Sequence, residues 1–277
     1  MIRPPFPGEL DRISELLGRA NDAPYDLRRV AAEKCFAPGY AGETVVRLYD
    51  ERDELRGISV TCGRTLRILA VDPAHRGRGI GSELLRDAEP RSHVVFAEAG
   101  NYFTPGVVEE DASTREFFRN RGYIESRWTW NLESHHLPDS LPGGVRRVGH
   151  DERDRVLDFI EREFGAIWRF ECSRAFDRHL PTLFIVESEG EVAGFAAHDV
   201  NNAGLGFFGP TGVARQLRGN GFGRLLLQAS LADLRRLGYG SAVIPWTDAL
   251  DFYRKSCGAE VTHKFVTLTR GQMKIEN

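Results

Sequence analysis

A fifteen-residue stretch occurs twice in the chain, and this repeat limits the possible folds more than any other feature. Residues 71–85, VDPAHRGRGIGSELL, align without gaps on residues 213–227, VARQLRGNGFGRLLL, and seven of the fifteen positions are identical. The identical residues are a valine, an arginine, three glycines and two leucines in fixed register. Because internal self-similarity is best interpreted before single motifs, we take the two halves as versions of one fold.

The length of the chain agrees with a duplication. Single hydrophobic cores stop growing near ~250 residues, and the chain has 277. Residues 132–144, LESHHLPDSLPGG, form a polar stretch with proline and glycine, which is typical of a linker. We therefore predict an N-terminal domain of residues 1–136 and a C-terminal domain of residues 137–277.

Hydrophobic periodicity predicts the same order of elements in both halves. In the first half we expect helices at residues 7–19, 27–36, 79–89 and 112–121, and strands at residues 44–49, 55–62, 64–71, 93–98 and 127–132. In the second half we expect helices at residues 152–164, 171–179, 221–237 and 248–256, and strands at residues 183–187, 191–199, 206–213, 241–245 and 263–269. Short apolar runs such as Phe184-Ile185-Val186 are typical of strands covered on both faces. The predicted fold class is α/β, with a mixed, mostly antiparallel sheet flanked by helices in each half.

Composition argues against several classes of function. The 37 basic and 40 acidic side chains give a net charge of −3, so there is no overall positive field to hold nucleic acid. No window approaches the ~18 apolar residues of a membrane span, and the N-terminal residues do not have the pattern of a signal peptide. The four cysteines, Cys35, Cys62, Cys172 and Cys257, have no zinc-binding spacing. We expect a cytoplasmic, bacterial protein without a metal, and neither nucleic acid nor a membrane as a partner.

Each copy of the repeat joins the end of a strand to the start of an amphipathic helix. Glycines at such a turn leave several backbone N–H groups unpaired, and the helix dipole favours negative charge there. The pattern is not a nucleotide P-loop, because neither Gly79 nor Gly221 is followed by Lys-Ser/Thr. It is not a dinucleotide fingerprint either, because Ser82 and Arg224 stand where a third glycine or alanine is needed. The repeat predicts a phosphate cradle, and a turn that only packs a helix on a sheet is the alternative.

The pattern Arg-x-x-Gly-x-Gly after a strand resembles the pyrophosphate motif of the GCN5-related N-acetyltransferases, the GNAT family. The resemblance extends over nearly all of both halves, so the chain is similar to a tandem protein with two GNAT-like domains. It implies that the loop amides bind acetyl-CoA and that the preceding strands pair with its pantetheine arm. The implied residues are Val71, Arg76, Gly77, Arg78, Gly79, Ile80, Gly81 and Ser82 in the first half, and Val213, Arg218, Gly219, Asn220, Gly221, Phe222, Gly223 and Arg224 in the second.

The strand before the second loop carries Gly209, Pro210 and Gly212. Proline cannot donate to a strand ladder and glycine weakens one, so we expect this strand to be bulged or splayed from its neighbour. A gap between strands is what a threaded cofactor needs. An ordinary irregularity of an edge strand would look the same in the sequence.

The two halves differ where the family places its general acid. In the second half, the resemblance implies that Tyr253 protonates the departing CoA thiolate. The corresponding pair in the first half is Phe117-Phe118, which has no hydroxyl. Gly258 lies five residues after Tyr253, whereas the family commonly has four, and a tyrosine that only packs its helix is the alternative. We predict a catalytic C-terminal domain and a degenerate or accessory N-terminal domain.

The expected reaction is direct transfer of an acetyl group from acetyl-CoA to a primary amine of a small molecule, by a monomer or homodimer. Two alternatives stay open: an acyltransferase that resembles mycothiol synthase and acts on an amino-sugar conjugate, and a regulatory acyl-CoA-binding protein without turnover. Residues 100–111 form a long loop that could be a lid, a domain contact or a vestige. Aromatic and acidic residues at the mouth of the C-terminal site would suit a cationic amine, although packing explains the tryptophans equally well. These residues are Trp168, Phe170, Glu171, Trp246, Asp248 and Asp251.

Overall fold

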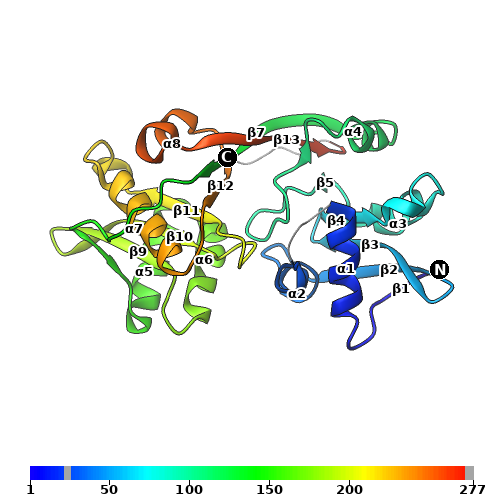
Figure 1. Cartoon of the computed structure of the whole chain (residues 1–277), viewed down its shortest axis with the longest axis horizontal. Coiled ribbons are helices and arrows are strands. Elements are labelled where there is room, and N and C mark those ends of the chain that lie inside the picture. Colours follow the sequence, from blue (N-terminus) through cyan, green and yellow to red (C-terminus); the bar gives the residue numbers. More distant parts are fainter. Residues whose placement is uncertain (22–25, 272–277) are drawn as a thin grey trace. The chain divides into compact units, whose positions relative to one another are not determined.

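The computed structural model describes residues 1–21 and 26–271 (Figure 1). The described residues form an α/β fold with mixed, mostly antiparallel sheets flanked by helices, as the sequence predicts. The chain divides into two compact units. Unit 1 contains Met1–Trp128 and Phe265–Asn277, and unit 2 contains Thr129–Lys264.

Unit 1 is built on a sheet with the strand order β1-β2-β3-β4-β5-β13. The β4–β5 pair is parallel, and the pairs β1–β2, β2–β3, β3–β4 and β5–β13 are antiparallel. Helices α1 and α3 both pack on β3 and β4 (Figure 1). The strands are β1 (Ile2–Arg3), β2 (Thr44–Glu51), β3 (Glu54–Cys62), β4 (Thr65–Val71), β5 (Val94–Val95), β6 (Val107–Val108) and β13 (Glu260–Thr269). The helices are α1 (Leu10–Asn21), α2 (Arg28–Phe36), α3 (Ile80–Ala88) and α4 (Ala112–Arg119).

Unit 2 contains an antiparallel sheet with the order β11-β10-β9-β8 and an antiparallel pair of β7 and β12. Alternate residues of β9 face two helical layers. Phe184 and Val186 pack with α7, whereas Leu183 and Ile185 pack with α5 and α6, so both faces are covered as predicted. The strands are β7 (Ile124–Ser134), β8 (Val145–Arg147), β9 (Leu183–Ser188), β10 (Glu191–His198), β11 (Phe208–Val213) and β12 (Ala242–Thr247). The helices are α5 (Arg153–Phe164), α6 (Ala166–Ser173), α7 (Phe222–Arg236) and α8 (Leu250–Cys257).

Each unit includes a terminal strand from the other half of the repeat. In unit 1, β13 pairs with β5 through Leu268 and Val95. In unit 2, β7 pairs with β12 through Leu132 and Ile244. The sequence prediction cuts the chain once, after residue 136, whereas the compact units divide both β7 and β13. The difference arises because β7 and β13 pair with strands that are distant in the sequence, on the other side of the polar linker.

The predicted elements are found with boundary shifts, and the larger corrections have local causes. The helix predicted at residues 171–179 is α6, which begins five residues earlier because Gly165, at φ 95°, ends α5 directly before it. The strand predicted at residues 93–98 is only the two-residue β5, because Phe96 takes a φ of 65° and leaves the sheet. Strands β1, β6 and β8 were not predicted, since runs of two or three residues carry no periodicity.

A glutamate held between two arginines fixes the start of the first helix in unit 1. Glu9 accepts hydrogen bonds from Nη1 and Nη2 of Arg3, both at 2.7 Å, and from Nη1 of Arg12 at 2.5 Å. It also accepts the amide of Phe6 at 2.7 Å. These bonds, chiefly those from Arg3, lower the pKa of Glu9 to about 2 although burial opposes the shift. We call this arrangement an arginine clamp.

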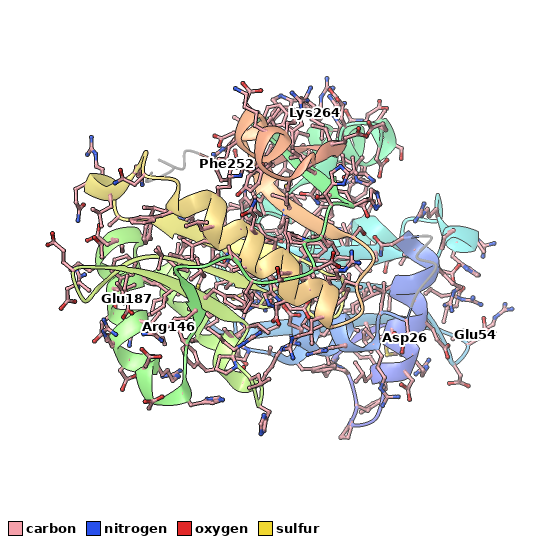
Figure 2. All side chains as sticks on the ribbon, turned by 60° about the vertical axis from the view of Figure 1, so that its left-hand side comes forward. Asp26, Glu54, Arg146, Glu187, Phe252 and Lys264 are labelled. Carbon is pink, nitrogen blue, oxygen red and sulfur yellow. The ribbon has the colours of Figure 1, made fainter. Side chains whose placement is uncertain are left out.

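Unit 2 contains the same clamp at the same spacing. Glu152 accepts hydrogen bonds from Nη1 and Nη2 of Arg146, both at 2.7 Å, from Arg155 at 3.5 Å and from the amide of Gly149 at 3.0 Å. Arg146 also contacts Glu187, and the two side chains lie together in Figure 2. The hydrogen bonds from Arg146 lower the pKa of Glu152 to about 2. The pattern Arg-x5-Glu-x2-Arg is therefore a second part of the duplication that the glycine repeat did not reveal.

Candidate acyl-CoA site

The two glycine loops have the same backbone conformation. A 3-10 turn follows the strand in each unit, at Pro73–His75 and at Arg215–Leu217. Each helix then begins after a glycine in the left-handed region, Gly79 at φ 86° and ψ −9° and Gly221 at φ 82° and ψ −5°. A residue with a Cβ adopts this conformation only at a steric cost. The duplication seen in the sequence is thus also a duplication of backbone geometry.

Unpaired amides gather at each loop, as the repeat predicts. In the part of the chain that the structure describes, the amides of residues 77–81 and 219–223 have no backbone acceptor. The amides of Ser82 and Arg224 are not among them, because each donates at 3.0 Å to the carbonyl three residues earlier. Converging amides at a helix N-terminus can hold an anion.

The first arginine of each loop turns back onto the preceding strand. Nε of Arg76 donates to the carbonyl of Val71 at 3.3 Å, and Nε of Arg218 donates to the carbonyl of Val213 at 3.1 Å. These matching bonds brace the turn. The two arginines therefore shape the cradle as well as add positive charge beside it.

Strands β4 and β5 of unit 1 separate next to the loop. They pair only over the first two residues of β4, and after Phe96 the chain leaves the sheet until β6 resumes pairing with β13. A cleft of about 660 Å³ opens here and reaches the loop. Its lining includes residues 68–71 of β4, Gly77, Gly79 and Gly81 of the loop, and Phe96, Val107 and Val108.

The long loop at residues 100–111 forms one wall of this cleft. Phe103 and Thr104 line the cleft, and Gly106 brings the backbone against β13. A Cβ on Gly106 would lie 2.5 Å from the carbonyl oxygen of Val266, which is backbone and cannot turn aside. Glycine is therefore required where the loop returns to the sheet.

Strands β11 and β12 of unit 2 pair over an even shorter length than β4 and β5. One parallel bridge, Phe207 with Val243, connects the start of β11 to β12. In unit 1 the amide of Phe96 still donates to β4 at 2.8 Å. The corresponding position in unit 2 is Pro245, which has no N–H. The predicted splay in the second copy is present, and Pro245 is a cause that the sequence analysis missed.

The strand before each loop has a register shift at the same place. The pairing of β4 with β3 shifts at Arg67, and that of β11 with β10 shifts at Gly209-Pro210. Aligned by the repeat, Arg67 corresponds to Gly209. The irregular strand predicted in the second copy is confirmed, and the first copy has one as well. Bulges bend a strand and redirect its side chains.

The two bulges differ in what they carry. Arg67 is fully buried and borders the cleft, and its Nε and Nη2 donate to the carboxylate of Glu98 at 2.5 and 2.7 Å. Its Nη1 donates to the carbonyl of Lys34, whose own ammonium is also fully buried. In unit 2, a Cβ on Gly209 would meet no atom within 4 Å. Paired charges fill the bulge region of unit 1, whereas the space beside Gly209 at the bulge of unit 2 is open.

Helices α4 and α8 pack on the two loops in the same way. The ring of Phe117 lies 3.8 Å from where a Cβ on Gly81 would be, and the ring of Phe252 lies 3.6 Å from the equivalent point on Gly223. The next residue of each helix is therefore also equivalent. These residues are Phe118 and Tyr253, so the extra residue before Gly258 does not displace the tyrosine.

Tyr253 lies in the core of unit 2 and is 7% exposed. Its ring packs edge-on against the ring of Phe208, with the ring centres 6.1 Å apart. Burial, together with Cys257 and Asp248 nearby, raises the pKa of its hydroxyl well above the ordinary value. The hydroxyl therefore stays protonated and can act as a hydrogen-bond donor. Phe118, fully buried in unit 1, offers no donor.

Arg121 contacts the glycine loop of unit 1, and the sequence analysis did not predict this contact. Its Nη2 donates to Oγ of Ser82 at 2.7 Å, and its guanidinium lies 3.8 Å from the centre of the Phe117 ring. The repeat gave no signal for it, because Ser256 holds the corresponding position in unit 2. Arg121 adds a positive charge beside the cradle of unit 1 only.

Packing accounts for several residues expected at the mouth of the C-terminal site. Trp168 stacks on Phe164 with the ring centres 5.2 Å apart. Phe170 lies 4.9 Å from the guanidinium of Arg174, and Glu171 is buried. Trp168 and Phe170 are both partly exposed.

Within residues 1–21 and 26–271, no group of three or more histidine, cysteine or acidic side chains is arranged to hold a metal ion. All four cysteines are buried and none forms a disulfide. None of the helices in these ranges is long and apolar enough to cross a membrane.

Two family models match the chain, one on each side of the linker. The acetyltransferase (GNAT) domain model matches residues 40–125, and the acetyltransferase (GNAT) family model matches residues 153–259. The chain is a tandem member of the GNAT family. Since this family uses acetyl-CoA as its acyl donor, the tandem GNAT protein is an enzyme of the N-acetyltransferase type.

Solved structures share the fold of the tandem GNAT protein. One is a region of a fungal multi-domain GH3 beta-N-acetylglucosaminidase, described as a glucosamine N-acetyltransferase region, with a TM-score of 0.76 and 16% identity over 97% of this chain. The match spans only 38% of that longer protein. A GCN5-related N-acetyltransferase from Sphaerobacter thermophilus has a TM-score of 0.67 and 18% identity over 99% of this chain and 97% of its own.

A tandem GNAT protein from the clavulanic acid biosynthesis pathway has a TM-score of 0.70 and 17% identity, over 99% of both chains. At these identities the likeness shows the fold alone. No curated protein matches the sequence.

Proposed function

We propose that this GNAT protein transfers an acetyl group from acetyl-CoA to a primary amine of a small molecule. The observation that carries the proposal is the same in both units: an amide cradle lies next to two strands that separate. The cradle supplies donors for the pyrophosphate, and the gap receives the pantetheine arm. Because backbone amides supply the donors, such a site needs no net positive charge on the chain, which is −3 overall.

The cofactor would contact each cradle mainly through the backbone. Ile80 is buried, so only its amide is available to a ligand, whereas Gly77, Arg78 and Gly79 are exposed. Val71 and Val213 would pair with the pantetheine arm at the ends of β4 and β11. Arg121 would add a charged contact in unit 1.

The chemistry requires one bond to form and one to break. A neutral amine attacks the thioester carbonyl, the N–C bond forms, the C–S bond breaks and the CoA thiolate departs. The new amide nitrogen loses a proton and the thiolate gains one. We assign Tyr253 to stabilise the thiolate by donating a hydrogen bond. Because its pKa is raised by burial, the tyrosine keeps its own proton, and the departing thiolate takes its proton from water.

We assign turnover to unit 2 and an accessory acyl-CoA site to unit 1. Two differences support this division. Unit 2 has the hydroxyl of Tyr253 and an open bulge at Gly209, whereas unit 1 has Phe118 and the buried pair of Arg67 with Glu98. An acceptor amine must reach the thioester, and in unit 1 the charged pair of Arg67 and Glu98 occupies the bulge region where Gly209 leaves open space in unit 2.

The test is to titrate acetyl-CoA into the wild type and into Gly79→Leu and Gly221→Leu, and to follow thiol release over a panel of amines. Leucine in the left-handed conformation costs about 1–2 kcal/mol and places a side chain in the cradle. We expect two binding events in the wild type and one in each variant, with thiol release lost only in Gly221→Leu. Circular dichroism confirms that both variants fold.

Other outcomes would revise the proposal. Loss of turnover only in Gly79→Leu would move the chemistry to unit 1. Binding without thiol release for every amine would identify a regulatory acyl-CoA-binding protein. Absence of binding in the wild type would refute the proposed function.

Amino sugars form a second acceptor class to test first in the panel. The fungal region with the same fold is described as a glucosamine N-acetyltransferase, although the two sequences are only 16% identical. Glucosamine and an amino-sugar conjugate should be compared with simple alkylamines. A kcat/KM for glucosamine at least tenfold above that for alkylamines would support this class.

A further inference from the structure

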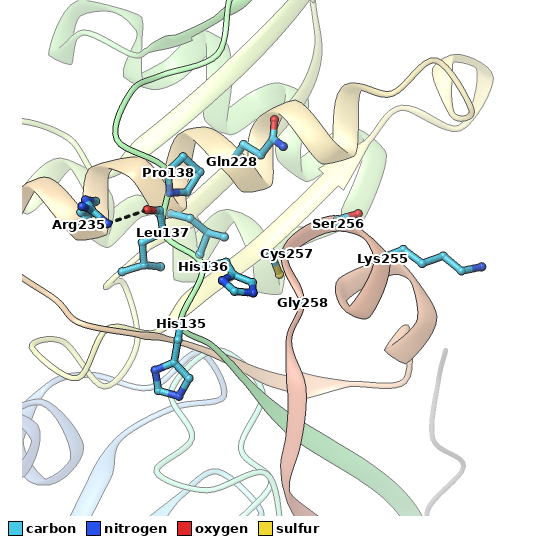
Figure 3. A pocket seen from close by; sticks show the side chains of 11 residues that line it. His135, His136, Leu137, Pro138, Gln228, Arg235, Lys255, Ser256, Cys257 and Gly258 are labelled. Atoms are coloured by element: carbon cyan, nitrogen blue, oxygen red, sulfur yellow. Dashed lines mark hydrogen bonds between the residues drawn. The ribbon is translucent and has the colours of Figure 1, made fainter.

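A second cavity, of about 500 Å³, lies in unit 2 and shares no lining residue with either cradle. It is bordered by the residues that follow β7, by α7 and by the C-terminal end of α8 (Figure 3). We call it the α7–α8 groove. The proposed acetyl transfer assigns no role to it.

The groove is lined by positive and neutral groups. Arg235 stands at one end and Lys255 at the other, with His136 between them (Figure 3). His135 adds a second imidazole, and none of the eleven lining residues carries a carboxylate. A concave surface lined by one sign of charge concentrates ligands of the other sign.

One acidic residue stands close to these cations. Asp139 pairs with Arg235 at 2.8 Å, and Arg235 also donates to the carbonyl of Leu137 at 3.1 Å. Arg235 is therefore held in place and partly neutralised. Lys255 is exposed, and no ion pair to it is found in the described part of the chain. Lys255 is thus the cation most available to a ligand.

Three of the lining residues are apolar, and the size of the groove exceeds that of an inorganic ion. Leu231 is fully buried, Leu137 is 6% exposed, and Pro138 lies beside them. A water molecule occupies about 30 Å³ in the liquid, so a cavity of 500 Å³ has room for an organic body. Small-molecule pockets combine apolar side chains with a few polar groups.

We propose that the α7–α8 groove binds a small organic anion, a carboxylate or phosphate attached to an apolar body. The anionic group meets Lys255 and the imidazoles, and the apolar body covers Pro138 and the exposed edge of Leu137. This site is independent of the proposed acetyl transfer, because it uses none of the cradle residues.

The test is calorimetric titration of the full chain with benzoate, phenyl phosphate and inorganic phosphate at constant ionic strength. Saturating CoA is present so that the two cradles are occupied. We expect phenyl phosphate or benzoate to bind, with Lys255→Gln weakening the affinity about threefold to tenfold. Arg254→Gln is the matched control, since it removes the same charge from the adjacent exposed residue that does not line the groove.

A second variant tests the apolar part of the site. Gln228 is half-buried and lines the groove, so Gln228→Trp should fill it and abolish binding without removing a charge. Equal affinity for inorganic phosphate and phenyl phosphate would mean an adventitious ion only. Equal losses in Lys255→Gln and Arg254→Gln, or no binding of any probe, would also overturn the proposal.

Discussion

The two units of this tandem GNAT protein have the same loops, and they differ in the side chains around them. Gly79 and Gly221 share one left-handed conformation, whereas the bulge residue is Arg67 in unit 1 and Gly209 in unit 2. A cradle made of amides tolerates changes of side chain as long as its glycines stay. A catalytic hydroxyl is a single side chain and can be lost in one substitution. Binding and turnover can therefore separate between two copies of one fold.

The largest expected effect concerns the charged pair that fills the bulge of unit 1. Glu98→Gln leaves the guanidinium of Arg67 buried without its counter-charge, and breaking a buried pair costs about 3–5 kcal/mol. We expect the free energy of unfolding to fall by about this amount in urea denaturation, with hydrogen exchange locating the loss in unit 1. Glu187→Gln in unit 2 is the control, because Glu187 is partly exposed beside Arg146 and should cost less than about 1 kcal/mol. Equal losses of unfolding free energy in Glu98→Gln and Glu187→Gln would show that the buried pair of unit 1 contributes no more stability than the exposed pair of unit 2.

The next largest effect distinguishes Tyr253 of unit 2 from the equivalent Phe118 of unit 1. Tyr253→Phe should lower kcat by about a hundredfold or more, because a positioned donor to the leaving group is lost. The affinity for acetyl-CoA should stay within about twofold, since the amide cradle is untouched. Steady-state kinetics and calorimetry measure the two quantities. Phe118→Tyr should leave kcat unchanged, and unchanged turnover in Tyr253→Phe would remove the tyrosine from the mechanism.

A smaller effect tests the cleft wall of unit 1. Gly106→Ala forces β6 away from β13, and overpacking of this kind costs about 1–3 kcal/mol. We expect lower stability and weaker acetyl-CoA binding at one of the two sites, measured by urea denaturation and calorimetry. Gly18→Ala is the control in the same unit, because a Cβ there meets no atom within 4 Å and alanine favours its helix. If Gly106→Ala changed neither stability nor binding, the loop at residues 100–111 would be able to move away from β13.

The smallest effect is shared by the two arginine clamps. The pKa values of Glu9 and Glu152 are lowered from 4.5 to about 2, chiefly by their arginine partners. A lowered pKa adds stability above pH 4.5 that is lost as the pH falls toward 2. Glu9→Gln and Glu152→Gln should therefore each cost about 1 kcal/mol at pH 7 and almost nothing near pH 2. Urea denaturation at both pH values measures this, and a cost that persists at pH 2 would assign it to packing.

Local chemistry made part of this structure predictable. Glycines at the loop starts and the proline after Gly209 restrict φ or remove a donor, so the turns, the helix starts and the irregular strand follow from nearby residues. The equivalence of Phe118 and Tyr253 was implied by the resemblance to the GNAT family. The arginine clamp was visible as Arg-x5-Glu-x2-Arg, but its residues do not align in the glycine repeat and were passed over.

Long-range pairing accounts for what the sequence did not reveal. Arg67 meets Glu98 across 31 positions, and nothing in the periodicity of either segment pairs a buried arginine with that glutamate. The contact of Arg121 with Ser82 has no counterpart in the second copy. The exchange of β7 and β13 depends on which strand edge is open, and periodicity reports only which face of a strand is apolar.

The exchange of terminal strands has a consequence for the order in which the protein is made. Unit 1 requires Leu268 and Thr269, which pair with β5, although almost all of its other residues are synthesised first. Domains commonly fold as they leave the ribosome, from the N-terminal side. Here the first unit stays open at one edge through the synthesis of the whole second unit, exposing β5 and β6 to other strands for that time. A chain truncated after residue 136 would keep that edge open permanently and should aggregate.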